Sequence, residues 1–212
     1  MKYLVTFFLI AATSLTYGQE NWKLAKEQKD IKVYVRKLDG SKIKEVKIEG
    51  RIKCELSEFV KALEDVEAQK TWVEETIDVE MIEKVNDSHF IFYQSTNMPF
   101  PVKDRDVVFE YTRNQNPQSK TVNLQFKNID GRYAIKDDFV RVPTSVSNYH
   151  LTPTADGFVT FDYFLKVDVG GRIPQWVINM AVSKTIISTV QSLYDYINTG
   201  IYKGVEIDGV VN

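Results

Sequence analysis

The segment that most constrains the fold of this chain is GGRIPQWVINMAVSKTIISTVQSLYDYINTG, residues 170–200. It opens with two glycines, carries Pro174 in its first turn and stops at Gly200, and its apolar residues recur every three or four positions. This spacing predicts one amphipathic helix of ~25 residues. A helix that long, with one continuous apolar face, has to lie against a broad apolar surface, and a curved antiparallel sheet provides such a surface.

Strand patterns dominate the sequence before this helix, because apolar and polar residues alternate in segment after segment. A short helical insert, capped by Ser57, is predicted from Leu56 to beyond Trp72. The order of strands, short helix, more strands and terminal helix predicts an α+β fold in which the sheet wraps around the last helix. The predicted strands are 31–37, 43–53, 76–85, 88–96, 105–113, 120–127, 139–151 and 157–167.

The first 18 residues have the layout of a secretory signal: Lys2, an apolar run, and small or polar residues up to Gly18. We therefore expect cleavage before Gln19 and export of one domain, residues 19–212, to the periplasm or the extracellular space. A retained membrane anchor is the alternative, but the apolar run is shorter than the ~20 residues that span a bilayer.

Charge and cysteine content exclude some classes of protein. The net charge of the whole chain is −2, and no basic cluster of the kind that holds nucleic acid is present. Cys54 is the only cysteine, so no disulfide can form within the chain, and packing has to stabilise the fold. We expect a monomer without nucleic-acid partners.

Three pieces of sequence carry a family resemblance: DVEAQKTW (65–72), NMPFPVKDRDVV (97–108) and VDVGGRIPQWVINM (167–180). In this order and spacing they resemble the steroidogenic acute regulatory protein-related lipid transfer (START) domain, over nearly all of residues 19–212. Val169 stands where that family usually has proline, which predicts a less rigid turn. The matching residues are Trp72, Pro99, Pro101, Arg105, Asp106, Asp168, Gly170, Gly171 and Pro174.

The resemblance implies a helix-grip fold with an internal hydrophobic tunnel that holds one lipid or other hydrophobic small molecule. The alternation of the strands is consistent with that fold but also with an ordinary filled core, because cavities leave no mark on periodicity. Polar groups for a ligand could come from Tyr111, Tyr149, Tyr163 and Asn179. The candidate ligand-binding residues are Trp72, Phe92, Phe100, Arg105, Val107, Phe109, Tyr111, Leu124, Tyr149, Phe161, Tyr163, Trp176, Asn179 and Met180.

The loop before residue 105 is stiffened by Pro99 and Pro101, and we interpret it as part of a gate to the tunnel. Phe100 is predicted to lie over the entrance, with the terminal helix hinged at the two glycines, 170 and 171. Arg105 shares the strand face of Val107, so it has to be paired, serve as a brace or contact the ligand. Asp106 points to the other face and is predicted to be solvated or to bind a turn.

Signals for an enzyme are weak, and we predict no catalytic residue, metal or cofactor. The chain lacks a nucleophile elbow, a phosphate-binding glycine loop and paired-cysteine metal spacing. Its two histidines, His89 and His150, are far apart in sequence. Two other functions stay open: an enzyme of the same superfamily, such as a polyketide cyclase or aromatase, and an exported interaction module with a filled core. Transient contact with a membrane surface is also expected of a lipid carrier.

Overall fold

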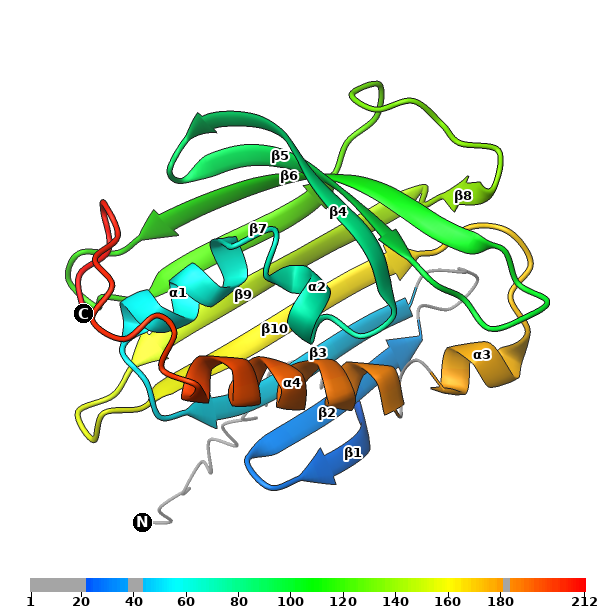
Figure 1. Cartoon of the computed structure of the whole chain (residues 1–212). Coiled ribbons are helices and arrows are strands. Elements are labelled where there is room, and N and C mark those ends of the chain that lie inside the picture. Colours follow the sequence, from blue (N-terminus) through cyan, green and yellow to red (C-terminus); the bar gives the residue numbers. More distant parts are fainter. Residues whose placement is uncertain (1–21, 38–43, 181–183) are drawn as a thin grey trace, which may run out of the picture.

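The computed structural model describes residues 22–37, 44–180 and 184–212, and it shows one strongly curved sheet with helices on its inner side (Figure 1). The described strands are β1 (Lys23–Gln28), β2 (Ile31–Lys37), β3 (Lys44–Ile52), β4 (Thr76–Asn86), β5 (His89–Thr96), β6 (Asp104–Gln115), β7 (Val122–Asn128), β8 (Phe139–Arg141), β9 (Thr144–Pro153) and β10 (Val159–Asp168). The described helices are α1 (Leu56–Glu64), α2 (Gln69–Trp72), α3 (Gln175–Met180) and α4 (Ile186–Asn198).

The order of strands in the sheet is β1-β2-β3-β10-β9-β7-β6-β5-β4, and neighbours along this path run antiparallel. The short strand β8 lies off the path and pairs with β6 in parallel. The pairing of β3 with β10 joins the first three strands to the rest. The α+β fold with a curved antiparallel sheet around a C-terminal helix is therefore confirmed.

Strand β1 was not predicted, because its sequence, KLAKEQ, has little apolar alternation and all six residues are exposed. The predicted strand 139–151 is two strands, β8 and β9, separated at Val142 and Pro143. Proline has no backbone N–H to donate, so a strand ladder tends to break there. The range predicted as one terminal helix holds two helices, α3 and α4, on either side of residues 181–183, which lie outside the described residues.

Helix α1 begins differently from the prediction. Its N-cap is Glu55, whose backbone N–H donates to Glu58 Oε2 at 3.0 Å in a capping box. Ser57 is buried, and its backbone N–H donates to Asn212 Oδ1 at 2.8 Å. Asn212 thus accepts a hydrogen bond from the first turn of α1.

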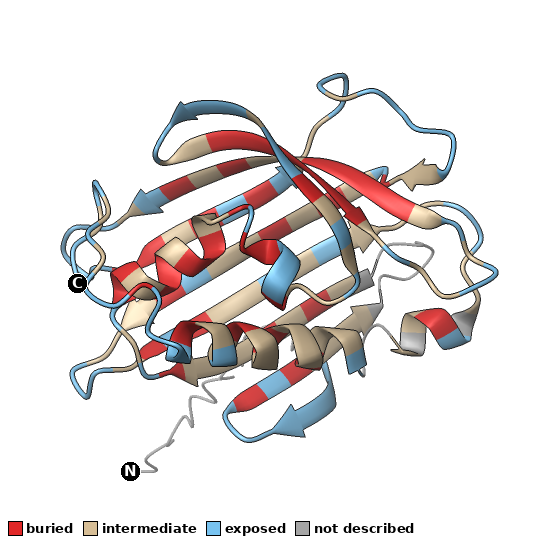
Figure 2. Cartoon of the chain, in the orientation of Figure 1, coloured by how far each residue is buried: buried red, intermediate tan, exposed pale blue. Residues whose placement is uncertain are grey.

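The main core lies between the inner face of the sheet and helices α1, α2 and α4 (Figure 2). A second, smaller cluster lies on the outer face, where Ile91, Tyr93 and Val108 are covered by Ile82, Ile129 and Tyr133. None of the helices in the described ranges is long and apolar enough to cross a membrane. Residues of the main core include Val33, Ile48, Phe59, Leu63, Trp72, Phe92, Tyr111, Leu124, Phe161, Val190 and Leu193.

Candidate ligand-binding site

Strand register brings most of the predicted site residues onto the inner face of the sheet. Tyr111 of β6 lies opposite Phe90 of β5, and Leu124 of β7 lies opposite Tyr149 of β9, which in turn lies opposite Tyr163 of β10. Directly opposed residues of antiparallel strands point to the same face. The inner face therefore gathers Phe92, Val107, Phe109, Tyr111, Leu124, Tyr149, Phe161 and Tyr163, and Trp72 reaches the same core from α2.

This inner face is not covered equally along its length. Tyr111, Leu124 and Phe161 are buried, whereas Tyr149 and Tyr163 keep an intermediate exposure, as do Phe109, Leu165 and Val167. Burial nevertheless raises the pKa of Tyr149 well above its usual value and that of Tyr163 to about 12, so protein surrounds both rings. The less covered part of the inner face thus lies toward the end of β10 that leads to α3.

The opposite end of the inner face is closed by polar groups. Glu64, at the end of α1, accepts hydrogen bonds from Tyr111 Oη and Arg113 Nε, each at 2.7 Å. Arg113 also donates from Nη2 to the carbonyl of Asp208 at 3.1 Å. Sequence reasoning missed Glu64 and Arg113, although Arg113 shares the strand face of Tyr111 and could have been included on that ground.

Arg105 is a brace between the proline loop and the turn before α3. Its Nε donates to the carbonyl of Val169 at 3.2 Å, its Nη2 to that of Gly170 at 2.9 Å, and its Nη1 to that of Lys103. Burial lowers the pKa of this guanidinium, which is 5% exposed, but carbonyl dipoles replace the missing water. Of the roles that the sequence left open for Arg105, the contacts correspond to the brace.

The turn that Arg105 holds is the predicted hinge. Gly170 and Gly171 both have φ of +69°, a left-handed conformation that favours glycine, and the Gly170 N–H donates to Asp168 Oδ1 at 2.9 Å. A Cβ on Gly171 would lie 3.2 Å from Arg105 Nη2. Both glycines thus fit the backbone of a turn that has to pass close to the guanidinium.

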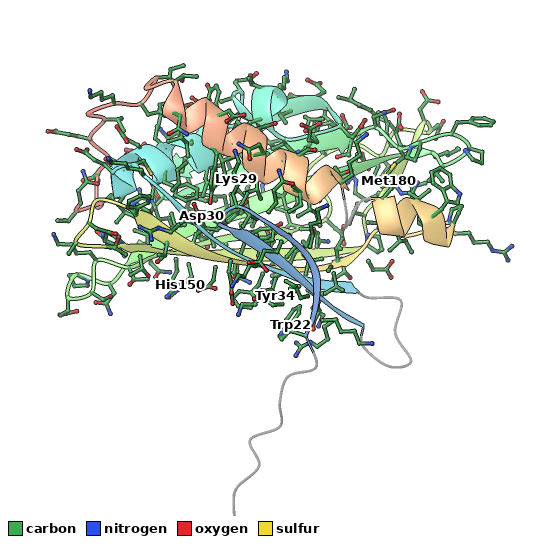
Figure 3. The ribbon with its side chains drawn as sticks, turned by 90° about the horizontal axis from the view of Figure 1, so that it is seen from below. Trp22, Lys29, Asp30, Tyr34, His150 and Met180 are labelled. Carbon is green, nitrogen blue, oxygen red and sulfur yellow. The ribbon has the colours of Figure 1, made fainter. Side chains whose placement is uncertain are left out.

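The remaining predicted residues lie around this same end of the molecule. The Phe100 side chain is 92% exposed and Trp176, on α3, is 50% exposed, so Phe100 covers no entrance in this structure. Met180 is half-buried at the end of α3 (Figure 3). The side chain of Asn179 lies outside the described residues.

The proline loop is fixed at its base, since the backbone N–H of Asn97 donates to the Glu75 carbonyl at 2.8 Å and that of Met98 to Asp104 Oδ1 at 2.8 Å.

The prediction for Asp106 was wrong. Its carboxylate is buried on the outer face of β6 and accepts two hydrogen bonds of 2.9 Å, from Nε and Nη2 of Arg141. The chain after β7 folds over this face and brings Arg141, on β8, next to β6. The sequence around residue 106 does not predict that β8 lies over Asp106, because β8 is distant from it in sequence.

Both histidines lie on the outer face of the sheet, because they pair with Thr112 and Asn123, which alternate with the inward-facing Tyr111 and Leu124. His89 Nε2 is 3.0 Å from Glu110 Oε1, and His150 Nδ1 is 2.5 Å from Asn123 Oδ1; Figure 3 labels His150. Burial raises the pKa of the Cys54 thiol to about 12. Across residues 22–37, 44–180 and 184–212, no three His, Cys, Asp or Glu side chains are placed to hold a metal ion.

Comparisons with known proteins agree with this architecture. The family model described as START domain matches residues 11–196. The crystal structure of a STAR-related lipid transfer protein from Xanthomonas axonopodis is 30% identical, with a TM-score of 0.75, and the match covers 84% of this chain and 98% of that one. An uncharacterised protein from Pseudomonas aeruginosa is 29% identical over 175 residues, 82% of this chain and 85% of that protein. The Zhui aromatase/cyclase from Streptomyces shares the fold alone, at 8% identity and a TM-score of 0.53, over 77% of this chain and 99% of that one.

Proposed function

Because this chain belongs to the START domain family, we propose that it binds one hydrophobic, lipid-like molecule between the inner face of its sheet and α4, and that it transfers or sequesters this molecule. The observation that carries the proposal is the accessible surface of Tyr149 and Tyr163, two rings that protein surrounds. Ligand pockets are mostly apolar with a few placed polar groups, and the neighbours of these tyrosines have that composition.

Native mass spectrometry of the purified protein, followed by lipid extraction, tests whether such a molecule is bound. We expect one copurified lipid per chain. A mass equal to that of the bare polypeptide, together with no uptake from lipid vesicles, would leave the proposal without support and favour an interaction module with a filled core.

A pair of leucine substitutions tests where the ligand lies. Leu165→Trp should fill open space, so it should displace the lipid and lower the free energy of unfolding by less than about 1 kcal/mol. Leu124→Trp is the matched control, because Leu124 is fully buried and added volume there should cost about 1–3 kcal/mol. Equal losses of stability in the two variants, with lipid retained in both, would place the ligand elsewhere.

An enzyme of the cyclase or aromatase kind is the alternative, and we propose that this chain is not one. Catalysis needs an acid, base or nucleophile free to reach a substrate. The charged side chains that the structure describes on this face, Glu64, Arg105 and Arg113, are instead bonded to other groups of the protein.

The proline loop and α3 are the parts that we propose to contact a membrane when the ligand is exchanged. Both lie at the same end of the molecule, where Arg105 joins their bases (Figure 1). Each presents an exposed aromatic side chain, Phe100 and Trp176, with exposed Lys103 and Arg172 close by in sequence. Aromatic groups beside basic ones suit the interface of an anionic bilayer.

Transfer of a fluorescent lipid between vesicles that contain phosphatidylserine tests this contact. Phe100→Ala should slow transfer roughly tenfold, as expected for the loss of one inserted aromatic side chain, and should leave the melting temperature unchanged because the ring is exposed. Ile201→Ala, which removes an exposed apolar side chain beyond the other end of α4, should leave transfer unchanged. Faster transfer by Phe100→Ala would instead identify Phe100 as a barrier to exchange.

A further inference from the structure

We infer that the outer face of the sheet carries a second binding site, and that its ligand is a neutral saccharide. The site is a hollow of about 580 Å³ over β6, β7, β9 and β10. It lies on the side of the sheet away from α4, where Figure 3 shows His150. Lipid binding on the inner face neither requires this site nor excludes it.

Two rows of side chains form the hollow, and each row crosses the four strands. Strand register places in the first row Thr112, Gln125, Asn148 and Phe164. The second row, two residues farther along each strand, holds Asn114, Asn123, His150 and Asp162. Strands lie about 4.8 Å apart and two residues span about 6.7 Å, so the rows cover roughly 14 Å by 7 Å. A short oligosaccharide can lie along such a surface.

The composition of these rows differs from that of an ordinary solvated strand face. The next row on the same face is mostly charged, with Glu110, Lys127 and Lys166. The two rows of the hollow contain no lysine or arginine, and three of their four strands contribute an asparagine. Asparagine is depleted in strands. Residues that oppose the local structure are expected where a surface has a binding function.

Cross-strand hydrogen bonds hold the amide side chains in place. Gln125 Nε2 donates to Asn148 Oδ1 at 2.9 Å. Asn123 Nδ2 donates to Asn114 Oδ1 at 3.3 Å, and Asn123 Oδ1 is 2.5 Å from His150 Nδ1. Among the described residues, Gln125 Oε1 and Asn148 Nδ2 have no partner in the protein. An acceptor and a donor are thus held at fixed positions on adjacent strands, so a ligand that uses both loses little side-chain entropy on binding.

A saccharide matches this arrangement. Each sugar hydroxyl can donate and accept, so neighbouring hydroxyls can bond to an amide N–H and an amide oxygen together. Phe164, which is 38% exposed at the β10 end of the first row, offers an aromatic ring to the apolar C–H face of a sugar. Asp162 adds a negative charge, and the Lys47 ammonium beside Phe164 lies 2.6 Å from the Glu49 carboxylate. Neutral sugars therefore fit better than acidic ones.

Isothermal titration calorimetry with soluble oligosaccharides tests the site. The probes are cellohexaose, xylohexaose, mannohexaose and chitohexaose, with hexagalacturonate as the acidic comparison. We expect a neutral probe to bind, and to bind more tightly than hexagalacturonate.

Variants of the hollow test where the sugar lies. Phe164→Ala should weaken binding roughly threefold to tenfold through the loss of the ring, and Phe164→Tyr should retain it. Asn148→Ala should weaken binding roughly fivefold, as expected for one lost hydrogen bond. The matched control is Ile77→Ala, which removes an exposed apolar side chain from β4 and should have no effect. Lipid uptake should stay unchanged in all four variants, because Phe164 and Asn148 face away from the inner face.

Each outcome decides a different part of the proposal. If none of the four neutral probes binds at millimolar concentration, the hollow is an ordinary solvated surface and the inference is wrong. If hexagalacturonate binds more tightly than every neutral probe, the assignment to neutral sugars is overturned. If a sugar binds equally well to Phe164→Ala, Asn148→Ala and Ile77→Ala, it lies elsewhere and the hollow is not its site. The proposed lipid function is unaffected by all three results.

Discussion

Arg105 of β6 and Arg141 of β8 point to opposite faces of the sheet, and each bonds to at least one group distant in sequence. The positive charge of Arg105 is stabilised by the dipoles of backbone carbonyls. That of Arg141 is stabilised by the negatively charged carboxylate of Asp106. A pattern of alternating residues predicts which face each side chain takes. It does not predict the partner, because the partner arrives from another segment.

Breaking the Asp106–Arg141 pair should be strongly destabilising. Arg141→Met would leave the Asp106 carboxylate, whose side chain has no exposed surface, without its counter-charge, at a cost of about 3–5 kcal/mol. Urea denaturation of the variant measures this cost. The control is Arg132→Met, because the pair of Arg132 with Glu83 is about half exposed on both sides and should contribute less than about 1 kcal/mol.

The double variant Asp106→Leu/Arg141→Met provides a further check. It removes both charges, so its stability should exceed that of Arg141→Met alone. A loss below about 1 kcal/mol in Arg141→Met would mean that water reaches Asp106 and that the segment after β7 covers it poorly.

At the scale of elements, α4 meets the sheet in a close contact over Gly50 of β3. A Cβ at residue 50 would lie 2.6 Å from the ring of Phe161 and 2.8 Å from Tyr194 Oη, closer than side chains tolerate. Phe161 and Tyr194 themselves meet edge to face, with ring centroids 6.2 Å apart. The absence of a side chain on Gly50 thus allows the helix and the strand to share one aromatic contact.

Gly50→Ala should therefore push α4 away from the sheet and lower the free energy of unfolding by about 1–3 kcal/mol, the usual cost of overpacking. Thermal denaturation measures the change. Adding Phe161→Leu to Gly50→Ala makes room beside residue 50 and should recover part of the loss. If Gly50→Ala were as stable as the unmodified protein, α4 would be able to move away from the sheet without loss of stability. That result would mean that α4 packs only loosely against β3.

Strands were predicted well where one of their faces is apolar and buried. Strand β2 has the predicted bounds, Ile31–Lys37, since its alternation is clear. The edge strand β1 lacks that alternation, and its position follows only from pairing with β2. For the site, period-two alternation predicted the faces of Phe109, Leu124 and Tyr163, but no local rule predicts how closely other elements cover them, because packing density is a property of the whole fold.

At the scale of the whole molecule, the signal-like segment stays a prediction, since residues 1–18 lie outside the described part of the chain. We propose that the chain is exported and cut before Gln19. Intact-mass and N-terminal peptide analysis of the protein from an extracytoplasmic fraction should give a chain that begins at Gln19. Recovery of the chain with residues 1–18 attached, in a membrane fraction, would show that the segment is kept as an anchor.

The pairing of β3 with β10 has a consequence for how this protein reaches its folded state. Ile48 lies opposite Tyr163, so the two portions of the sheet can join only after most of the chain has been made. Until then β3 has an open edge that carries Val46 and Ile48, and such edges pair readily with other chains. Contacts this distant in sequence also slow folding, to roughly milliseconds or seconds. Newly synthesised chains should thus be most prone to pair with one another through β3 before β10 is in place.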